Sequence, residues 1–190
     1  MLKIIVGILL GVLLAAVGAY LYFATGRAPV AVTAPPMPME RTLARTGLHA
    51  YLDKLPHPEP QVPTNETTYL AGATVYRQNC AVCHGLPGES KTTIAQGMYP
   101  PPPQLFHGVG VTDDEAWETY WKVENGIRMT GMPGFKGHLS ETQIWQVTVL
   151  LKNADQISPA VRAALAGAPK EESQPTPAAA PVRKKITSRK

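Results

Sequence analysis

The segment Cys80-Ala81-Val82-Cys83-His84 holds the side chains with the most distinctive chemistry in this 190-residue chain, which contains only two cysteines. Two thiols at this spacing can add across the two vinyl groups of a haem, and the adjacent histidine can then meet the iron on its proximal face. The pattern therefore predicts that Cys80 and Cys83 attach one haem c covalently and that His84 is an iron ligand.

Three other uses of the cysteine pair are open. A thioredoxin-like dithiol would need a preceding strand and a βαβ context, which the sequence does not suggest. A structural zinc site would need a second ligand pair at finger-like spacing, and His107 and His138 are too far apart to supply one. A plain disulfide between the cysteines would leave His84 without a role. Haem attachment is therefore the favoured interpretation.

A haem iron held by one histidine needs an assignment for its sixth position. Met132 lies in Gly131-Met132-Pro133-Gly134, a loop stiffened by Pro133. A thioether is a soft, neutral ligand that favours ferrous iron and raises the reduction potential. We therefore predict Met132 as the second axial ligand, and we expect Met98 to be a loop side chain packed on an apolar surface. The alternatives are an open site or one of three other side chains: Met129, His107 and His138.

Helical patterns surround these residues, and they predict the elements that position them. No stretch alternates with a period of two, so we expect an all-α fold. Three helices are predicted in the central part of the chain: Tyr69 to Cys80 behind Thr67 and Thr68 as N-caps, Thr112 to Glu124 behind a capping box and before Asn125-Gly126, and Ser140 to Asn153 behind a second capping box.

The N-terminal segment, residues 1–27, is predicted to be a membrane anchor. Ile4 to Ala24 is almost wholly apolar and is bracketed by Lys3 and Arg27. As a helix it would span about 31 Å, close to the hydrocarbon thickness of a bilayer. A cleaved signal sequence is the alternative, although no suitable cleavage site follows directly. Both interpretations export the rest of the chain.

Proline and charge divide the remainder of the chain. Residues 28–66 are predicted to be a proline-rich linker with a short amphipathic helix at 40–54, residues 67–157 the haem domain, and residues 158–190 a disordered, Pro/Ala-rich basic tail. The whole net charge of +4 falls on residues 170–190, whereas the predicted haem domain has six basic and eight acidic side chains. This distribution excludes a basic nucleic-acid-binding domain.

The haem motif, the later Met132-Pro133 pair and the flanking helices together resemble the class I cytochrome c family, and most closely its single-haem bacterial members. The resemblance covers Leu70 to Ala154. It implies a small helical domain wrapped around one covalent haem, with the iron bound by His84 and Met132. It also implies a close crossing of the first and last helices, with Gly72 and Tyr76 facing three candidates: Trp145, Val149 and Leu150.

The same resemblance implies further contacts around the haem. In this family a proline carbonyl commonly accepts the proximal imidazole Nδ1–H, and a leucine two residues later lies against the haem. Pro103 and Leu105 fit these roles, with Pro101 and Pro102 as rival alignments. Three side chains between helix and ligand loop could bind the haem propionates, although ordinary packing or solvation explains them equally well: Tyr120, Trp121 and Arg128.

These features predict an electron carrier, not an enzyme: a single-pass protein of the bacterial cytoplasmic membrane whose haem domain faces the periplasm. Its partners would be redox proteins, a respiratory complex or a dehydrogenase, with no role for nucleic acid. The alternative is a haem subunit of a larger dehydrogenase or oxidase, or a peroxidase-like enzyme with an open or displaceable sixth site.

Overall fold

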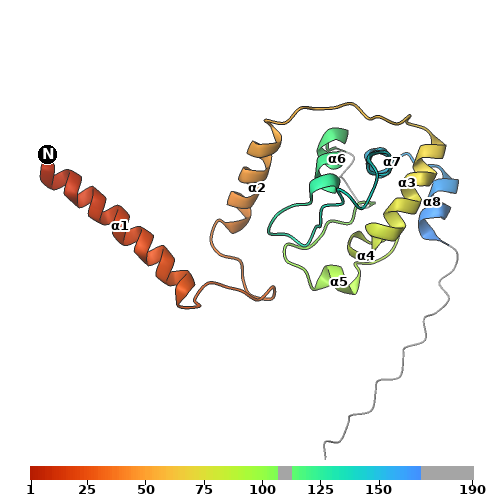
Figure 1. The fold of residues 1–190 in the computed structure, drawn as a ribbon. Coiled ribbons are helices and arrows are strands. Elements are labelled where there is room, and N and C mark those ends of the chain that lie inside the picture. The colour runs from red at the N-terminus through yellow and green to blue at the C-terminus, as the bar shows by residue number, and fades with distance from the viewer. Residues whose placement is uncertain (107–112, 168–190) are drawn as a thin grey trace, which may run out of the picture.

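Eight helices occur in the residues that the computed structural model describes, which are 1–106 and 113–167 (Figure 1). No β-strand occurs in these two ranges, so the predicted all-α fold is confirmed. The helices are α1 (Leu2–Ala24), α2 (Glu40–Leu52), α3 (Glu66–Asn79), α4 (Ala81–His84), α5 (Thr93–Gln96), α6 (Ala116–Asn125), α7 (Glu141–Lys152) and α8 (Pro159–Ala166).

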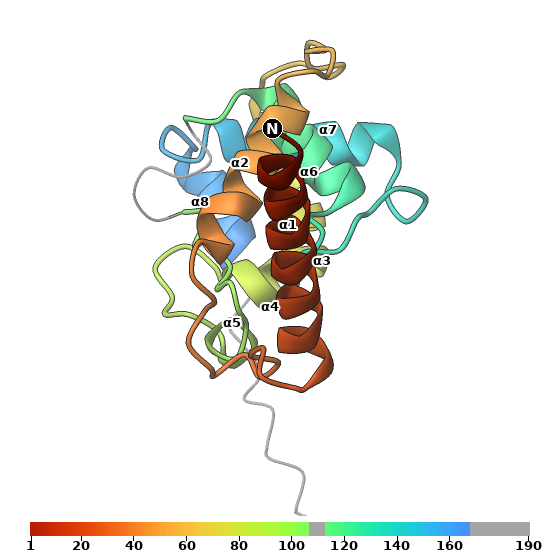
Figure 2. The ribbon, with the colours of Figure 1, turned by 90° about the vertical axis from the view of Figure 1, so that its left-hand side faces the viewer.

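Helix α1 stands apart from all other elements. Its 23 residues are exposed on every side, and it is long and apolar enough to cross a membrane. Figure 1 shows α1 on one side of the molecule, with α2 between it and the other helices. Figure 2 looks from the side of α1 and shows α1 in front of α2. The helix predicted for this segment is therefore present.

The predicted short helix within the linker is confirmed as α2, and it lies against α6 (Figure 1). Leu52 at its end is buried, with 2% of its surface exposed. The rings of Tyr51 and Trp121 lie 5.6 Å apart, and His57 stacks on Trp117 at 4.0 Å with the rings almost parallel. Residues 40–57, which we call the arm, are thus fastened to α6.

The core forms where α3 crosses α7. A Cβ on Gly72 would lie 2.4 Å from the Gln146 carbonyl oxygen and 3.1 Å from the Leu150 Cβ, so only glycine permits this approach. The expected close crossing is present, and Leu150 is one of its partners. The backbone of Gln146 supplies the other nearest atoms, and neither Trp145 nor Val149 is among the three atoms nearest to a Cβ on Gly72. Tyr76, fully buried, donates its hydroxyl to the Gly85 carbonyl at 2.7 Å.

Helix α3 begins three residues before the predicted start. Asn65 is its N-cap and accepts a hydrogen bond from the Thr68 amide at 3.0 Å. Asparagine in extended backbone is among the strongest N-caps, so the Thr67 and Thr68 caps are wrong and both threonines lie inside the helix. The capping box predicted for α7 is confirmed, since Ser140 and Gln143 exchange hydrogen bonds.

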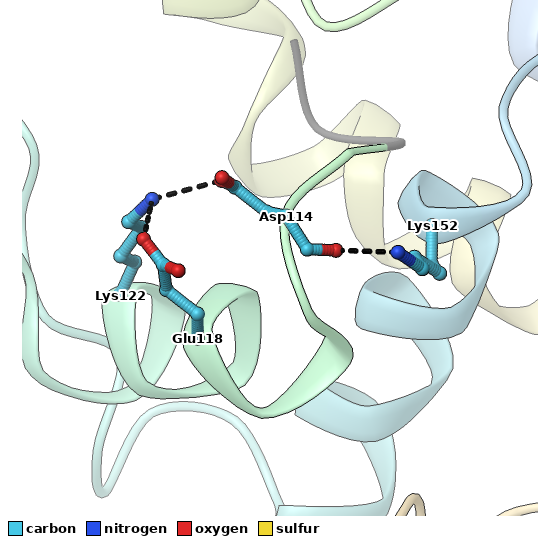
Figure 3. A network of polar contacts seen from close by, with 4 residues as sticks. All are labelled: Asp114, Glu118, Lys122 and Lys152. Carbon is cyan, nitrogen blue, oxygen red and sulfur yellow. Dashed lines mark hydrogen bonds and ion pairs between the residues drawn. The ribbon is translucent and has the colours of Figure 1, made fainter. Parts of the chain in front are cut away.

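Helix α6 begins at Ala116, after the predicted capping box. Thr112 lies outside the described residues, and Glu115 occupies the N-cap without a side-chain hydrogen bond. Asp114 instead bonds outward: its carboxylate lies 2.8 Å from Lys122 Nζ and its carbonyl accepts from Lys152 Nζ at 2.7 Å (Figure 3). The predicted start at Thr112 is therefore wrong, because the helix begins at Ala116 and Glu115, expected inside the first turn, stands at the N-cap. The predicted stop is confirmed at Asn125, before Gly126 at φ 69°.

Helix α8 occupies residues predicted to be disordered. Ser158 caps it, Pro159 stands in its first turn, and Val161 and Leu165 are fully buried. It packs on α3, where Arg77 donates to the Ala164 carbonyl. Proline is favourable at the first helical position, and the apolar pair at i and i+4 supplies a face to bury. The prediction of disorder from residue 158 onward is therefore wrong for residues 159–166.

Candidate haem site

The cysteine pair and His84 lie on a single turn of helix that continues from α3. The amide of His84 bonds to the Cys80 carbonyl at 2.9 Å, and that of Cys83 to the same oxygen at 3.1 Å. This turn, α4, places both free thiols and the imidazole along one cavity. Because the motif forms one helical turn, all three of its side chains line the same cavity.

The cavity has a volume of about 360 Å³ and lies between α4, the residues before Leu105, the end of α6 and the loop after it. None of the side chains that line it is charged, and most are apolar. All six residues singled out from the sequence line it: Cys80, Cys83, His84, Pro103, Leu105 and Met132. Contributions of α6 and α7 that the sequence did not point to include Val123 and Leu151.

A backbone carbonyl fixes the orientation of His84. Its Nδ1 lies 2.7 Å from the carbonyl oxygen of Pro103. Because a carbonyl can only accept, Nδ1 must carry the proton, which leaves the lone pair of Nε2 for a metal. Pro101 and Pro102 also line the cavity, but the carbonyl that accepts the hydrogen bond of His84 is that of Pro103.

Burial favours the uncharged forms of His84 and Cys80. Desolvation lowers the pKa of His84, and the hydrogen bond to Pro103 only partly offsets this effect. Burial, together with repulsion from Cys83, raises the pKa of the Cys80 thiol to about 12. At neutral pH the imidazole is therefore unprotonated at Nε2, as a metal ligand must be.

The loop that carries Met132 is held to the end of α6 by close backbone contact. A Cβ on Gly126 would lie 2.5 Å from the Gly134 amide nitrogen, and one on Gly134 would lie 2.7 Å from the Asn125 carbonyl. The amide of Phe135 bonds to the Val123 carbonyl at 3.0 Å. Two glycines thus let the chain fold back tightly after Met132.

Within this loop, the side chain of Thr130 holds the backbone that leads to Met132. Its hydroxyl donates to the Ile127 carbonyl at 2.7 Å and accepts from the Met132 amide at 3.1 Å. The Ile127 amide in turn bonds to the Met132 carbonyl at 3.3 Å. Thr130 was not singled out from the sequence, although a hydroxyl two residues before Met132 is a recognisable ST-type turn signal.

Two of the alternative sixth ligands, Met129 and His138, lie away from the cavity. Met129 is 89% exposed, with φ at 60°, and His138 is exposed; neither lines the cavity. His107 lies outside the described residues. Met98, expected to pack on an apolar surface, does line the cavity and is therefore the second thioether within it.

The three residues suggested for the haem propionates do not meet at the cavity. Tyr120 stacks on Trp145 with ring centroids 4.2 Å apart, and Trp121 contacts Tyr51 of the arm. Arg128 is exposed, and none of the three lines the cavity. The packing interpretation fits both aromatic side chains, and solvation fits Arg128.

The donor set of the cavity fits a c-type haem. Two thiols, an imidazole with a free Nε2 and two thioethers line an uncharged space whose volume lies within the range of about 300–1,000 Å³ typical of cofactor pockets. Soft sulfur and imidazole ligands suit iron in a haem, whereas magnesium and calcium prefer oxygen. The cavity therefore has the chemistry that the motif predicts.

Residues 67–151 match the family model described as Cytochrome C oxidase, cbb3-type, subunit III. No curated protein and no solved structure matches the chain. The matched residues begin in the first turn of α3 and end in the last turn of α7, so they include Cys80, Cys83, His84 and Met132 of the cavity. This part of the chain is a domain of the c-type cytochrome family, and its cofactor is a covalently bound c-type haem.

Proposed function

We propose that this protein carries single electrons between redox partners, with the haem attached through Cys80 and Cys83 and the iron bound by His84 and Met132. The observation that carries the proposal is the convergence of these four side chains on one uncharged cavity. The haem, when bound, supplies the one-electron Fe(II)/Fe(III) couple. His84 and Met132 would hold the iron and leave no position on it for a substrate, so the chemistry that the haem would supply is electron exchange.

The chain's own residues would bind and orient the cofactor and exclude water from it. The Pro103 carbonyl holds the proton on Nδ1 of His84 and raises the basicity of the ring, which strengthens Nε2 as a ligand. The hydrogen bonds of Thr130 and the paired glycines hold the Met132 loop in one arrangement. Val123, Leu151 and Phe135 supply apolar walls.

A role as a haem subunit of a membrane-bound respiratory oxidase is the second candidate. It is favoured by the description of the matching family model, which names a subunit of a cbb3-type oxidase. In that role the partners would be the other subunits of the oxidase. Purification from native membranes in mild detergent separates the two candidates, because a subunit migrates with its complex and a free carrier migrates alone.

Helix α1 would anchor the protein in the bacterial cytoplasmic membrane and place the haem domain on the periplasmic side, where haem c is attached to exported chains. The length and composition of α1 and its complete exposure support this placement. A protease added to intact spheroplasts should cleave the haem domain, and protection of the domain would contradict this orientation.

The optical spectrum of the oxidised holoprotein tests the axial ligands. Iron–methionine ligation gives ferric haem a weak long-wavelength absorption band, which we expect in the native protein. Met132→Ala should abolish this band, give a high-spin spectrum that binds cyanide rapidly, and lower the reduction potential, because a soft ligand that favours Fe(II) is lost.

Met98→Ala and Met129→Ala are the controls, since they remove the other thioether of the cavity and an exposed one outside it. Both should keep the band. Loss of the band in Met98→Ala, with retention in Met132→Ala, would overturn the assignment and make Met98 the ligand. A native spectrum without the band would contradict the closed electron-carrier site altogether.

A further inference from the structure

Met98 and Gly131 form a contact across the cavity between segments that are far apart in the sequence. A Cβ built on Gly131 would lie 1.9 Å from Cε of Met98, 3.5 Å from its Sδ and 3.9 Å from its Cγ. The three nearest atoms all belong to this one side chain. The methionine therefore lies directly over a glycine of the ligand loop.

This contact stands at the edge of the cavity. Met98 lines the cavity and is itself half-buried, whereas Gly131 is exposed. One part of the methionine thus faces the haem space, and the contact that holds its tip is open to solvent. We propose that Met98 seals the haem crevice by packing on Gly131 and so limits the access of water and small solutes to the cofactor; this inference rests on the proposed electron-transfer function.

The segments on both sides of the seal are held by hydrogen bonds. Thr92 caps α5 and donates its hydroxyl to the Val82 carbonyl at 2.8 Å, which ties the segment before Met98 to the haem motif. On the other side, Thr130 holds the turn that presents Gly131. The supports are fixed, and the flexible element between them is a methionine, whose unbranched side chain fills irregular gaps.

Sealing the crevice should raise the reduction potential. Water near a haem stabilises the more highly charged ferric state, and an apolar shell favours the ferrous state. Met98 would therefore act on the haem by excluding water from it, without bonding to the iron. Its removal should lower the potential while leaving the methionine–iron band in place.

Gly131 offers a way to displace the seal without changing Met98. Its φ lies outside the left-handed region, so alanine is acceptable to the backbone there and its only obstacle is the tip of Met98. Gly131→Ala should push the methionine aside and reproduce the effect of Met98→Ala. Once Met98 has been truncated, the three atoms nearest to the added methyl group are gone, so the double variant should add little.

The experiment measures the midpoint potential and the rate of reduction by ascorbate, a small reductant that needs no docking site, in the holoprotein. We expect Met98→Ala and Gly131→Ala each to lower the potential and change the ascorbate rate by a similar factor, and the double variant to match the single ones. Met98→Leu should restore most of the native behaviour because it refills the gap. Gly97→Ala is the matched control, since its Cβ would meet only carbonyl oxygens at 3.6 and 3.8 Å.

Additive effects in the double variant, or a Met98→Ala protein with native potential and rate, would overturn the inference. The long-wavelength band is recorded for every variant. If the native protein lacks the band or a reversible redox couple, the proposed function is wrong. If the native protein has both but the variants do not change the potential or the rate, only the crevice seal is wrong.

Discussion

Lys122 joins two carboxylates inside a partly buried network (Figure 3). Its Nζ lies 2.8 Å from Asp114 and 2.7 Å from Glu118, and only 20% of its side chain is exposed. Burial alone would lower the pKa of a lysine, yet the two carboxylates outweigh this effect and the pKa of Lys122 is raised above 10.5. The network fixes the chain before α6 to α6 itself, and Lys152 of α7 holds the Asp114 carbonyl.

A raised lysine pKa makes stability fall in alkali. The contribution of Lys122 is complete below the ordinary lysine pKa of 10.5 and is lost as the pH rises through the higher value of the folded protein. Lys122→Met should lower the free energy of unfolding at neutral pH by about 2 kcal/mol, the value for a hydrogen bond to a charged group, and should flatten part of the alkaline decline. Urea unfolding of the holoprotein at neutral and strongly alkaline pH measures both effects.

Lys136→Met provides the matched control, because Lys136 pairs with Glu124 at 3.3 Å while its own side chain is 73% exposed. An exposed pair should contribute less than about 1 kcal/mol. Equal losses in the two variants would show that the partial burial of Lys122 adds nothing.

At the scale of the elements, α8 shows that the folded part extends past the residues that match the cytochrome family model. That match ends at residue 151, but Val161 and Leu165 of α8 are fully buried against α3. Ser158 donates to Glu66 at 2.5 Å, which joins the start of α8 to the start of α3. Helix α8 therefore covers a face of α3 that would otherwise be open to solvent.

A chain that stops after Ile157 should be markedly less stable than one that stops after Gly167. Exposing the face under Val161 and Leu165 removes two buried apolar side chains, each worth about 1.5–3 kcal/mol. Thermal and urea unfolding of the two holoproteins measure the difference. If both chains unfold at the same denaturant concentration, α8 contributes nothing to the fold.

The helices predicted correctly are those with strong local signals. Ser140 and Gln143 mark the start of α7, and Asn125-Gly126 marks the end of α6, because capping and stopping depend on a few neighbouring residues. Helix α8 was missed because its stability depends on burial against α3, which is distant in sequence. The predicted start of α6 was too early, because Glu115 stands at the N-cap without a side-chain hydrogen bond. The preceding Asp114 is instead held by tertiary bonds to lysines on two helices, which the local sequence does not reveal.

The residues of the candidate site also differ in whether the local sequence reveals them. Cys80, Cys83 and His84 form a motif that chemistry alone explains, and the chemistry of a thioether in a loop stiffened by proline indicated Met132. Resemblance to a family pointed to Pro103 and Leu105. The role of Met98 could not be predicted, because its contact with Gly131 joins residues 33 positions apart through the tertiary fold. A methionine in a loop has no local signature that separates surface packing from the lining of a cavity.

At the scale of the whole molecule, the arm of residues 40–57 joins the N-terminal part of the chain to the haem domain. Leu52 is buried, and two aromatic contacts link the arm to Trp117 and Trp121 of α6. The arm precedes the residues that match the family model, so it is a feature of this chain beyond that match. It shortens the effective distance between α1 and the haem domain.

Limited proteolysis measures how firmly the arm is held. Trypsin can cut after Lys54, beside the buried Leu52, only when the arm detaches locally. Leu52→Ala and Trp117→Ala should each accelerate this cleavage several-fold, as followed by mass spectrometry of the fragments. Leu43→Ala, which alters a side chain that is 63% exposed, should cleave at the native rate. Equal rates in all four proteins would mean that the contacts with α6 do not restrain the arm.

The docked arm also sets how far the haem can travel from the lipid surface, if α1 spans the membrane as proposed. With the arm in place, only residues 25–39 separate α1 from a fixed point on the domain, and they reach at most about 50 Å. With the arm released and extended, residues 25–65 would reach about 140 Å. The volume that the haem can sample grows with the cube of this reach, so docking raises its local concentration at membrane-bound neighbours about twentyfold. A short contact between two tryptophans and the arm thereby favours electron exchange within the membrane plane over exchange with distant soluble proteins.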